Sequence, residues 1–424
     1  MGEEEEAISG IACDVTGTIT AYGRGAQKLF GWTPDELIGK QKVTIFHTPE
    51  NVAVLVPRLL QTAAETGVFE EEVTLVKKDG TRFRGRLRVR PLYRGGTIVG
   101  YMGITRPVEV AGATLEQSVP RPPPLLLAIR TLRAPFLQAT FVPVILGAVL
   151  AWQTLGAFVL GLFALTLAGT ALLHLATNVL NDYFDFRSGV DLAVKHQNPF
   201  AGGGRVLPLG FVLPSRSFTL GLGLLAGGGL VGVYLALVRG PLIFAFLAVA
   251  LVSAYFYVAP PVRFAHHGVG EILVGLNFGP LMVLGTFYVL TQTLTLTALL
   301  ASIPVGLLVA GILWINEVPD VEADQSTGKR TLVTRLGQAR AARWHAGILG
   351  ASYVIVVVSV LTGVLPVGTL LTLLTIPLAV KVTRVARRHY ADPHAVIPAN
   401  ALTILVHLLF GGLLIAGVVS AAIL

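Results

Sequence analysis

Hydrophobic and polar positions divide the chain into two regions with different periodicities. Residues 8–108 contain short runs in which apolar and polar residues alternate, and these runs predict strands near 9–14, 18–22, 70–77, 82–92 and 97–104 around a helical middle. Lys78, Asp79 and Gly80 form the predicted hairpin turn before the strand near 82–92, since an Asp-Gly pair readily adopts positive φ. The pattern predicts a small soluble α+β domain over residues 1–108.

Beyond residue 124 the chain is a series of long apolar stretches. Their lengths are near or somewhat under the ~20 residues that a helical membrane span requires. We place them at 136–153, 156–180, 219–238, 241–258, 270–290, 294–316, 344–364, 366–380 and 400–422. The chain is therefore predicted to be multi-domain, with an all-α polytopic membrane bundle of about nine transmembrane helices over residues 125–424. Pro-rich residues 109–124 are predicted to be a semi-rigid linker.

The composition supports a membrane protein and argues against a nucleic-acid-binding one. Charged residues make up 13% of the chain and hydrophobic residues 53%, whereas soluble domains contain roughly 25% charged residues. Residues 121–424 hold 18 Lys and Arg against nine Asp and Glu. These basic residues lie mainly between apolar stretches, where membrane topology explains them, so we expect no nucleic-acid partner. Cys13 is the only cysteine, which excludes an intramolecular disulfide.

The placement of basic residues also predicts the orientation in the membrane. Loops that follow even-numbered spans contain fourteen Lys and Arg, whereas the opposite loops contain only Arg239. By the positive-inside rule, the loops rich in basic residues lie in the cytosol. We therefore expect a multi-pass protein of the cell membrane with a cytosolic N-terminal domain and an external C-terminus. The opening residues, Met-Gly-Glu-Glu-Glu-Glu, resemble no signal peptide.

Carboxylates of the membrane region are concentrated in two clusters, each where an apolar stretch ends. Seven of the nine belong to these clusters, which are Asp182, Asp185 and Asp191, and then Glu317, Asp320, Glu322 and Asp324. Carboxylates are costly near hydrocarbon unless they pair, bind a cation or line a wet cavity, so a functional role is the first hypothesis. By the predicted orientation, both clusters lie on the cytosolic side.

The spacing within each cluster predicts a cation site. If the second span remains helical at its end, Asn178, Asp182 and Asp185 share one face, with Asn181 beside Asp185. The helical spacing recurs in Asn316, Asp320 and Asp324, and Pro319 predicts a local kink just before Asp320. Mg²⁺ prefers such oxygen ligands and is often shared with substrate phosphates. The predicted metal ligands are Asn181, Asp182, Asp185, Asn316, Asp320 and Asp324.

Basic residues in the same loops predict a diphosphate as the bound group. Two sets of carboxylates that face each other could hold it through Mg²⁺, while cationic side chains contact its oxygens directly. The candidates are Lys195, Arg205, Lys329 and Arg330. Glycines 202–204 would allow backbone N–H groups to approach a phosphate, although a flexible loop explains them equally well.

These residues resemble the two Asp-rich motifs of the UbiA superfamily of intramembrane prenyltransferases. The motifs here are Asn181-Asp182-Tyr-Phe-Asp185 and Asp320-Val-Glu-Ala-Asp324. The resemblance covers roughly residues 125–424 and implies a nine-helix bundle that binds a polyprenyl diphosphate with Mg²⁺. It also implies that Asp185, Asp320 and Asp324 are the catalytic residues. The prenyl group would be transferred to an aromatic acceptor at the lipid bilayer.

Within the superfamily, the chain is most similar to the 1,4-dihydroxy-2-naphthoate polyprenyltransferases of menaquinone synthesis. The motifs that carry this similarity include Asn198-Pro-Phe-Ala-Gly-Gly-Gly-Arg205, Gly268-Val-Gly270-Glu271 and Gly328-Lys329-Arg330-Thr331-Leu332. The loop after the first motif lacks the Arg-Thr-x-x-Arg-Pro run of the hydroxybenzoate branch. Another phenol, a quinone precursor or a lipid is the alternative acceptor.

The N-terminal region resembles a PAS domain over almost its full length. The resemblance rests on Asp14-Val-Thr-Gly17, Leu29-Phe30-Gly31-Trp32-Thr33-Pro34 and Lys77-Lys78-Asp79-Gly80-Thr-Arg-Phe83. PAS domains are sensory modules that bind different ligands or none, so neither a ligand nor a protein partner is assigned. The region lacks the flavin-linking cysteine motif, and its one histidine, His47, is interpreted as a polar residue at a helix start. We expect this domain to regulate the enzyme and not to perform its chemistry.

Further candidates lie near the two clusters, each with a structural alternative. His174 would assist deprotonation of the acceptor or serve as a hydrogen-bonded structural histidine, and Tyr257 would line the acceptor site or anchor a span at the interface. Asn178 and Asp191 complete this group. A PAS-gated sensor or transporter is the rival outside the enzymes. A transporter would carry its ionisable groups nearer the bilayer midplane.

Overall fold

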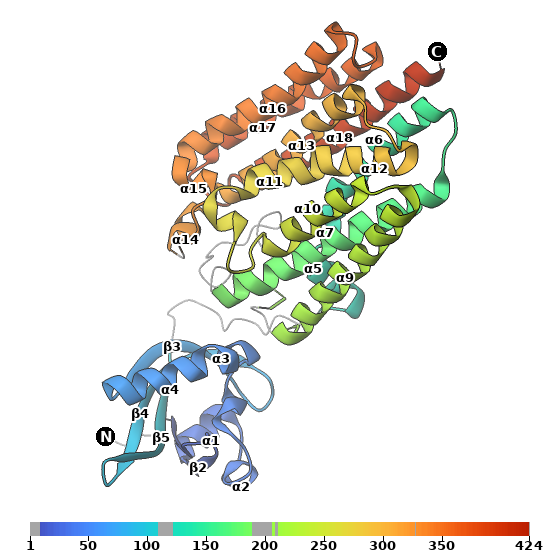
Figure 1. Ribbon diagram of the computed structural model, residues 1–424. Coiled ribbons are helices and arrows are strands. Elements are labelled where there is room, and N and C mark those ends of the chain that lie inside the picture. The colour runs from blue at the N-terminus through green and yellow to red at the C-terminus, as the bar shows by residue number, and fades with distance from the viewer. Residues whose placement is uncertain (1–8, 109–121, 189–205, 208–210, 327, 424) are drawn as a thin grey trace. The chain divides into compact units, whose positions relative to one another are not determined.

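The computed structural model describes residues 9–108, 122–188, 206–207, 211–326 and 328–423. The chain forms two compact units, Met1–Pro123 and Pro124–Leu424, each with its own internal contacts (Figure 1). Each unit is described separately below.

The N-terminal unit is built on a five-stranded antiparallel sheet in the order β2-β1-β5-β4-β3. The strands are β1 (Ser9–Asp14), β2 (Ile19–Tyr22), β3 (Phe69–Val76), β4 (Arg82–Arg94) and β5 (Thr97–Pro107). The predicted strands are confirmed, with β4 and β5 running slightly longer than expected. The turn after β3 is also as predicted, because Gly80 has φ of 84° and donates its N–H to the carbonyl of Lys77 at 3.0 Å.

Short helices between β2 and β3 cover one face of this sheet. They are α1 (Arg24–Phe30), α2 (Pro34–Leu37), η2 (Val43–Phe46), α3 (Pro49–Ala53) and α4 (Leu55–Thr66). Phe30, Leu37 and Leu59 from these helices pack with Leu75 and Leu87 of the sheet in one core. Apolar residues at alternate strand positions supply the sheet side of that core, which leaves the other face of β3 and β4 to polar side chains.

A small cavity of about 60 Å³ lies inside the core of the N-terminal unit. Cys13, which is buried, and His47 are among the residues that line it. His47 caps the end of η2 and precedes Thr48, which is the N-cap of α3, so it lies beside a helix start as predicted. Burial lowers the pKa of His47 to about 4, so its imidazole is neutral at pH 7.

The C-terminal unit consists of helices, most of them long and apolar (Figure 1). The first part contains α5 (Pro124–Leu132), η3 (Ala134–Leu137), α6 (Gln138–Leu155), α7 (Leu160–Ser188), α9 (Pro214–Arg239), α10 (Leu242–Phe256) and η4 (Phe264–His267). The middle contains α11 (Gly270–Leu276), η5 (Asn277–Leu281), α12 (Met282–Thr291), α13 (Leu296–Glu317) and α14 (Val321–Ser326). The last part contains α15 (Leu332–Leu336), α16 (Gln338–Leu361), η6 (Val367–Thr375), α17 (Ile376–His389) and α18 (Ile397–Ile423).

Eight helical segments within the described residues are long and apolar enough to cross a membrane. The stretch near 241–258, also predicted to be a span, corresponds to α10, an apolar helix of 15 residues. The segment predicted at 366–380 is longer than expected, because η6 and α17 together run from Val367 to His389. The basic residues expected in the loop after this segment lie on α17 instead; they are Lys381, Arg384, Arg387 and Arg388. Helix α17 accommodates them because Ala379, Val382 and Ala386 form a separate buried stripe.

Helix α13 is the centre of this unit. Of its most apolar 18-residue stretch, 67% is buried, a larger share than in any other described span. The helical run formed by α11 and η5 packs closely against it through small residues. A Cβ atom added to Gly279 would lie 2.7 Å from the Cα atom of Gly306, and one added to Gly306 would clash with the carbonyl oxygen of Gly275. The two backbones therefore touch with no side chain between them. Glu271 begins the same row of residues, four positions before Gly275, so this contact sets its distance from α13.

We predict that Gly306→Ala destabilises the membrane unit by about 1–3 kcal/mol, because the added methyl group must push α11 and α13 apart. The measurement is thermal unfolding of the full chain in detergent. Gly350→Ala on α16 is the matched control, since a Cβ atom there meets nothing within 4 Å. An unfolding temperature for Gly306→Ala as high as that of the control would contradict the close helix contact.

Candidate functional site

The first carboxylate cluster lies on the last turns of α7. Because α7 continues as a helix to Ser188, Asn178, Asp182 and Asp185 share one face of it, as predicted. Asp182 and Asp185 are 5% and 8% exposed. Two carboxylates are thus buried side by side at the end of an apolar helix, which requires compensating positive charge.

The second cluster does not continue the helix that precedes it, contrary to the predicted helical spacing. Helix α13 ends at Glu317, the chain turns through residues 318–320, and α14 begins at Val321. Pro319 lies in this turn, where its missing N–H costs no helical hydrogen bond. The N–H of Asp324 donates to the carbonyl of Asp320 at 2.9 Å, which fixes Asp324 in the first turn of α14.

The break separates Asn316 from the two aspartates. Asn316 remains on α13, where its Oδ1 accepts a hydrogen bond from Nδ2 of Asn400 on α18 at 2.5 Å. The same Asn400 amide also donates to the carbonyl of Ile315 at 3.2 Å. Both asparagines are buried, so this contact joins α13 to α18 inside the bundle.

Lys329 links the two clusters. Its Nζ lies 3.5 Å from Oδ1 of Asp324, and the exposed fractions of the two side chains are 14% and 3%. The charges that act on Asp185 of α7 are those of Lys329, Asp324 and Arg133. Carboxylates from α7 and α14 therefore both act on one largely buried ammonium group, although they are more than 130 residues apart in the sequence.

The electrostatics of the cluster follow from this arrangement. Burial lowers the pKa of Lys329, but the carboxylates of Asp324 and Asp185 outweigh this effect and hold its pKa above the ordinary value. Burial, together with the charge of Asp324, raises the pKa of Asp320 to about 7, and Lys329 limits the rise. Additional positive charge at this position would therefore stabilise the ionised carboxylates.

Arg133 is a second cation of the site that sequence reasoning did not identify. It lies between α5 and η3, and its Nη1 is 3.4 Å from Oδ1 of Asp182. Its φ of 51° is in the left-handed region, which is unusual for a residue with a side chain. Its position before the first apolar stretch gave it no link to either cluster. Only the packing of η3 against α7 brings the two side chains together.

Glu271 and Glu317 form a buried carboxyl pair that was also missed. They are 3% and 7% exposed, and the charge of Glu271 acts on Glu317. Oε1 of Glu271 accepts the backbone N–H of Leu332 at 2.6 Å. A signal for Glu271 was present in the sequence, since it is a lone carboxylate at the start of an apolar stretch.

This hydrogen bond from Leu332 is one of several that hold the loop carrying Lys329. The N–H of Arg330 donates to the carbonyl of His266 at 3.1 Å, and Nη2 of Arg335 donates to the carbonyl of His267 at 2.8 Å. The N–H of Lys329 itself donates to the carbonyl of Asp324 at 2.8 Å. Residues 266–271 thus fix the backbone that follows Lys329, while Asp324 holds the backbone N–H of Lys329 itself.

Of the remaining residues predicted from the sequence, some lie near the site, one is exposed and others fall outside the described part of the chain. His174 is buried with its Nδ1 2.7 Å from Oγ1 of Thr140, an arrangement that fits its structural alternative, and Nδ2 of Asn178 donates to the carbonyl of Leu132 at 3.3 Å. Tyr257, at the end of α10, is close to the charges of the site. The side chain of Arg330 is exposed. Asp191, Lys195, Arg205 and glycines 202–204 lie outside the described residues.

The first cluster has donor atoms that fit a hard cation. Oδ1 of Asp185 and Oδ1 of Asn181 are buried with no hydrogen-bond partner among the described residues. Within that part of the chain, however, no three His, Cys, Asp or Glu side chains converge closely enough to hold a metal ion by themselves. The oxygens present therefore suit a cation that takes its other ligands from water or a bound phosphate, as Mg²⁺ commonly does.

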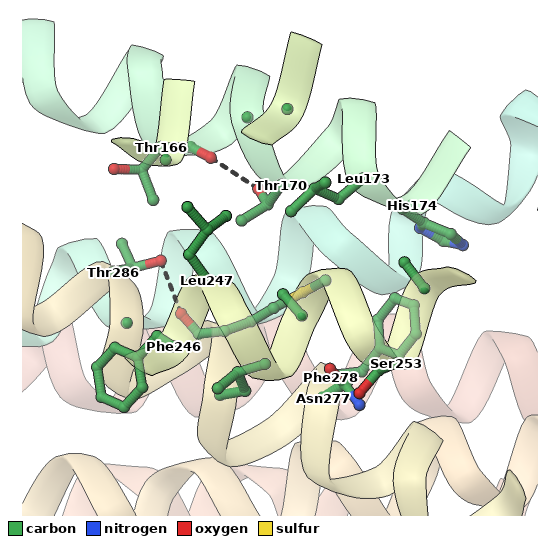
Figure 2. A pocket seen from close by; sticks show the side chains of 18 of the residues that line it. Thr166, Thr170, Leu173, His174, Phe246, Leu247, Ser253, Asn277, Phe278 and Thr286 are labelled. Atoms are coloured by element: carbon green, nitrogen blue, oxygen red, sulfur yellow. Dashed lines mark hydrogen bonds between the residues drawn. The ribbon is translucent and has the colours of Figure 1, made fainter. Parts of the chain in front are cut away.

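An apolar pocket of about 150 Å³ lies among α7, α9, α10 and α12 (Figure 2). His174, Ser253 and Asn277 line one end, while Thr166 and Thr286 line the other (Figure 2). The hydroxyls of Thr166, Thr170 and Thr286 donate to carbonyl oxygens one turn earlier in their own helices, so little polar surface is left facing the pocket. Tyr257 lines this pocket and also lies near Lys329 and Asp185, so pocket and charged cluster are neighbours.

A helical bundle that buries carboxylates and a lysine beside an apolar pocket is typical of a membrane enzyme whose substrate has a charged head and an apolar tail. This chain belongs to the UbiA prenyltransferase family, which its residues 140–402 match, and residues 7–106 match the PAS domain. It is therefore a prenyltransferase with an N-terminal PAS domain. The fold and the family predicted from the sequence are both confirmed.

Two curated relatives illustrate the similarity. The 1,4-dihydroxy-2-naphthoate octaprenyltransferase of Bacillus subtilis is 30% identical over 248 residues, which cover 58% of this chain and 78% of the relative. The enzyme of the same name from Escherichia coli is 32% identical over 294 residues, which cover 68% of this chain and 94% of the relative.

We predict that Glu271→Ala weakens prenyl transfer through the position of Lys329. Removing the carboxylate leaves the partly buried N–H of Leu332 without its acceptor, a change that costs about 1 kcal/mol. The expected result is a rise of about tenfold or more in KM for the isoprenyl substrate, with a smaller change in kcat. Glu271→Gln retains an oxygen at this position and should recover most of the loss.

The matched control is Glu322→Gln, which changes an exposed carboxylate on α14. Proteolysis of the 325–332 segment gives a second measurement that does not depend on activity, and it should accelerate in Glu271→Ala only. Unchanged KM and unchanged proteolysis in a folded Glu271→Ala variant would show that the hydrogen bond does not position Lys329.

Proposed function

We propose that this enzyme catalyses Mg²⁺-dependent transfer of a polyprenyl group from an isoprenyl diphosphate to 1,4-dihydroxy-2-naphthoate, a step of menaquinone synthesis. The observation that supports it most is that Asp185 of the first cluster and Asp324 of the second act on the same ammonium group, that of Lys329. A site with both signs of charge suits a diphosphate that brings a metal ion with it. The names of the curated relatives support the naphthoate acceptor.

In this proposal Asn181, Asp182, Asp185, Asp320 and Asp324 hold the metal ion. Asn316 is left out of the set because its oxygen accepts a hydrogen bond from Asn400. When bound, Mg²⁺ would neutralise negative charge on the diphosphate as it leaves. Asp185, Asp320 and Asp324 are the residues on which turnover depends most.

Lys329 supplies the fixed positive charge of the site. Its Nζ is held by Asp324, and the backbone that follows it is anchored to residues 266–271, so the ammonium does not need to reorganise when the diphosphate leaves. Lys195, Arg205 and Arg330 are the other basic residues proposed to contact the diphosphate oxygens. Such charges act most strongly where water is excluded.

The apolar pocket supports binding of the prenyl chain. The allylic C–O bond breaks with its electron pair passing to the diphosphate, and the apolar wall keeps water away from the resulting cation. The acceptor ring then forms a C–C bond to the prenyl carbon. In the naphthoate reaction the ring carbon that receives the chain loses its carboxyl group as CO₂, which restores the aromatic ring.

The charge distribution also supports an orientation with the PAS domain and both carboxylate clusters in the cytosol. Basic residues outside the spans are concentrated on one side, which follows the positive-inside rule. This side would receive a water-soluble naphthoate from the cytosol, while the prenyl chain enters from the bilayer. We further propose that the PAS domain regulates turnover, because every residue assigned to the chemistry lies beyond residue 125.

We predict that Asp185→Asn and Asp320→Asn each reduce turnover by about 100-fold or more, because each removes a charge that the reaction needs near the diphosphate. The assay follows prenylated product by mass spectrometry, with purified enzyme, Mg²⁺, an isoprenyl diphosphate and a panel of phenolic acceptors. Glu322→Gln again serves as the control. Turnover of both variants at the level of this control would refute the two-cluster mechanism, and a product formed only with another acceptor would refute the naphthoate assignment.

A second prediction concerns the pocket. Gly285 lines it, and a Cβ atom added there has Phe246 as its nearest neighbour at 3.7 Å, so a larger side chain can point into the space without moving the backbone. Gly285→Leu should lower kcat/KM at least tenfold for a long prenyl diphosphate and leave that for dimethylallyl diphosphate within about twofold. Gly350→Leu on α16 is the control. Equal losses for long and short donors in Gly285→Leu would show that the prenyl chain lies elsewhere.

A further inference from the structure

The outer face of the PAS sheet carries a patch of arginines. Arg84, Arg86, Arg88 and Arg90 occupy every second position of β4, and Arg106 of β5 lies directly opposite Arg86. The residues between them, such as Leu87 and Val89, are buried in the core, so the arginines point to the opposite side. We call these five residues the arginine face. All five are exposed.

Only part of this positive charge is balanced within the described residues. Glu72 of β3 forms ion pairs with Arg84 and Arg86 at 3.3 and 3.1 Å, and Glu70 pairs with Arg88 at 2.6 Å. Arg90 and Arg106 form no ion pair with any residue that the structure describes. Five arginines against two glutamates leave an excess of three positive charges.

This excess is a property of the face and not of the domain. Residues 1–120 contain 14 Lys and Arg against 15 Asp and Glu, so the region as a whole is nearly neutral. Like charges that lie directly opposite each other on neighbouring strands, as Arg86 and Arg106 do, destabilise a sheet. Binding of an anionic partner would remove this repulsion.

The face also has an apolar part. Met102 and Ile104 of β5 lie on the same side of the sheet, opposite Arg90 and Arg88, and both are half-buried. Leu92 continues the row beyond Arg90 and is 37% exposed. Guanidinium groups beside apolar side chains suit a lipid surface, in which a layer of phosphate headgroups covers a layer of hydrocarbon.

We propose that the arginine face binds the anionic phosphate headgroups of the bilayer in which the membrane unit lies. The chain provides the proximity, because Pro107 at the end of β5 and Ala134 at the start of the first span are only 27 positions apart. A domain tethered this closely meets the bilayer at high effective concentration, so individually weak contacts suffice. This interaction is independent of the prenyl-transfer mechanism.

The test uses the full chain in nanodiscs of phosphatidylcholine alone or of an equimolar mixture with phosphatidylglycerol. Cys13→Ala removes the only cysteine. Met102→Cys then places a nitrobenzoxadiazole label on the arginine face, and Ala64→Cys, on the exposed side of α4, places it among the helices on the opposite side of the sheet. Quenching of the label by lipids with nitroxide headgroups measures contact with the bilayer surface.

The label at position 102 should be quenched with phosphatidylglycerol and not with phosphatidylcholine alone, and the label at position 64 should not be quenched in either. Salt at about 1 M should abolish the effect, since the Debye length falls to about 3 Å. Arg90→Gln with Arg106→Gln should shift the docked equilibrium about 30-fold, because each arginine near an anionic surface contributes about fivefold, or about 1 kcal/mol.

The charge-matched control is Arg24→Gln with Lys42→Gln, which removes two exposed cations from outside the arginine face and should leave the quenching unchanged. Quenching at position 102 that is equal in both lipids, or that persists in the Arg90 and Arg106 double variant, would overturn the proposal. Absence of quenching in the anionic nanodiscs would overturn it too, and would direct the search to a soluble acidic partner.

Discussion

The membrane unit is organised around one constraint, the burial of carboxylates beside Lys329. Several ionisable groups leave bulk water at the end of an apolar bundle, and they are tolerated only because opposite charges lie among them. Lys329 comes from the loop before α15, Asp185 from α7 and Asp324 from α14. Each depends on the others, so the helices that carry them are coupled through charge as well as through packing.

The packing beneath the cluster explains how this arrangement is held. Gly275, Gly279 and Gly306 allow α11 and α13 to touch, which brings Glu271 next to Glu317. Glu271 in turn accepts the N–H of Leu332 and so determines where the loop with Lys329 runs. The contact between small residues in the bundle therefore determines the position of Glu271, and Glu271 determines the position of the charged loop through one hydrogen bond. The same logic explains why Asn316, one residue from Glu317, faces α18: successive residues of a helix point about 100° apart.

Local patterns in the sequence were sufficient for much of this. The 3.6-residue spacing of Asn178, Asp182 and Asp185 predicted one face of α7, and alternation predicted the strands of the PAS sheet. The pairing of Asn181 and Asp185 with a metal ion, and of the basic residues with diphosphate, remains a prediction. Contacts between residues far apart in the sequence could not be predicted. Arg133 approaches Asp182 only because η3 packs on α7, and no periodicity relates residues 49 positions apart. Pro319 predicted a kink near Asp320, whereas the helix ends there, and the contact of Asn316 with Asn400 of α18 cannot be read from local spacing.

Charge and hydrocarbon are combined differently in the two units. In the membrane unit the carboxylates and Lys329 are buried, where a low dielectric strengthens their interactions and makes removal of any one of them costly. On the PAS sheet the arginines are exposed, where water and salt weaken each ion pair and no single residue dominates. The buried cluster is therefore suited to orienting one substrate precisely enough for bond cleavage. The exposed face is suited to a reversible attraction that depends on the summed charge of the surface it meets.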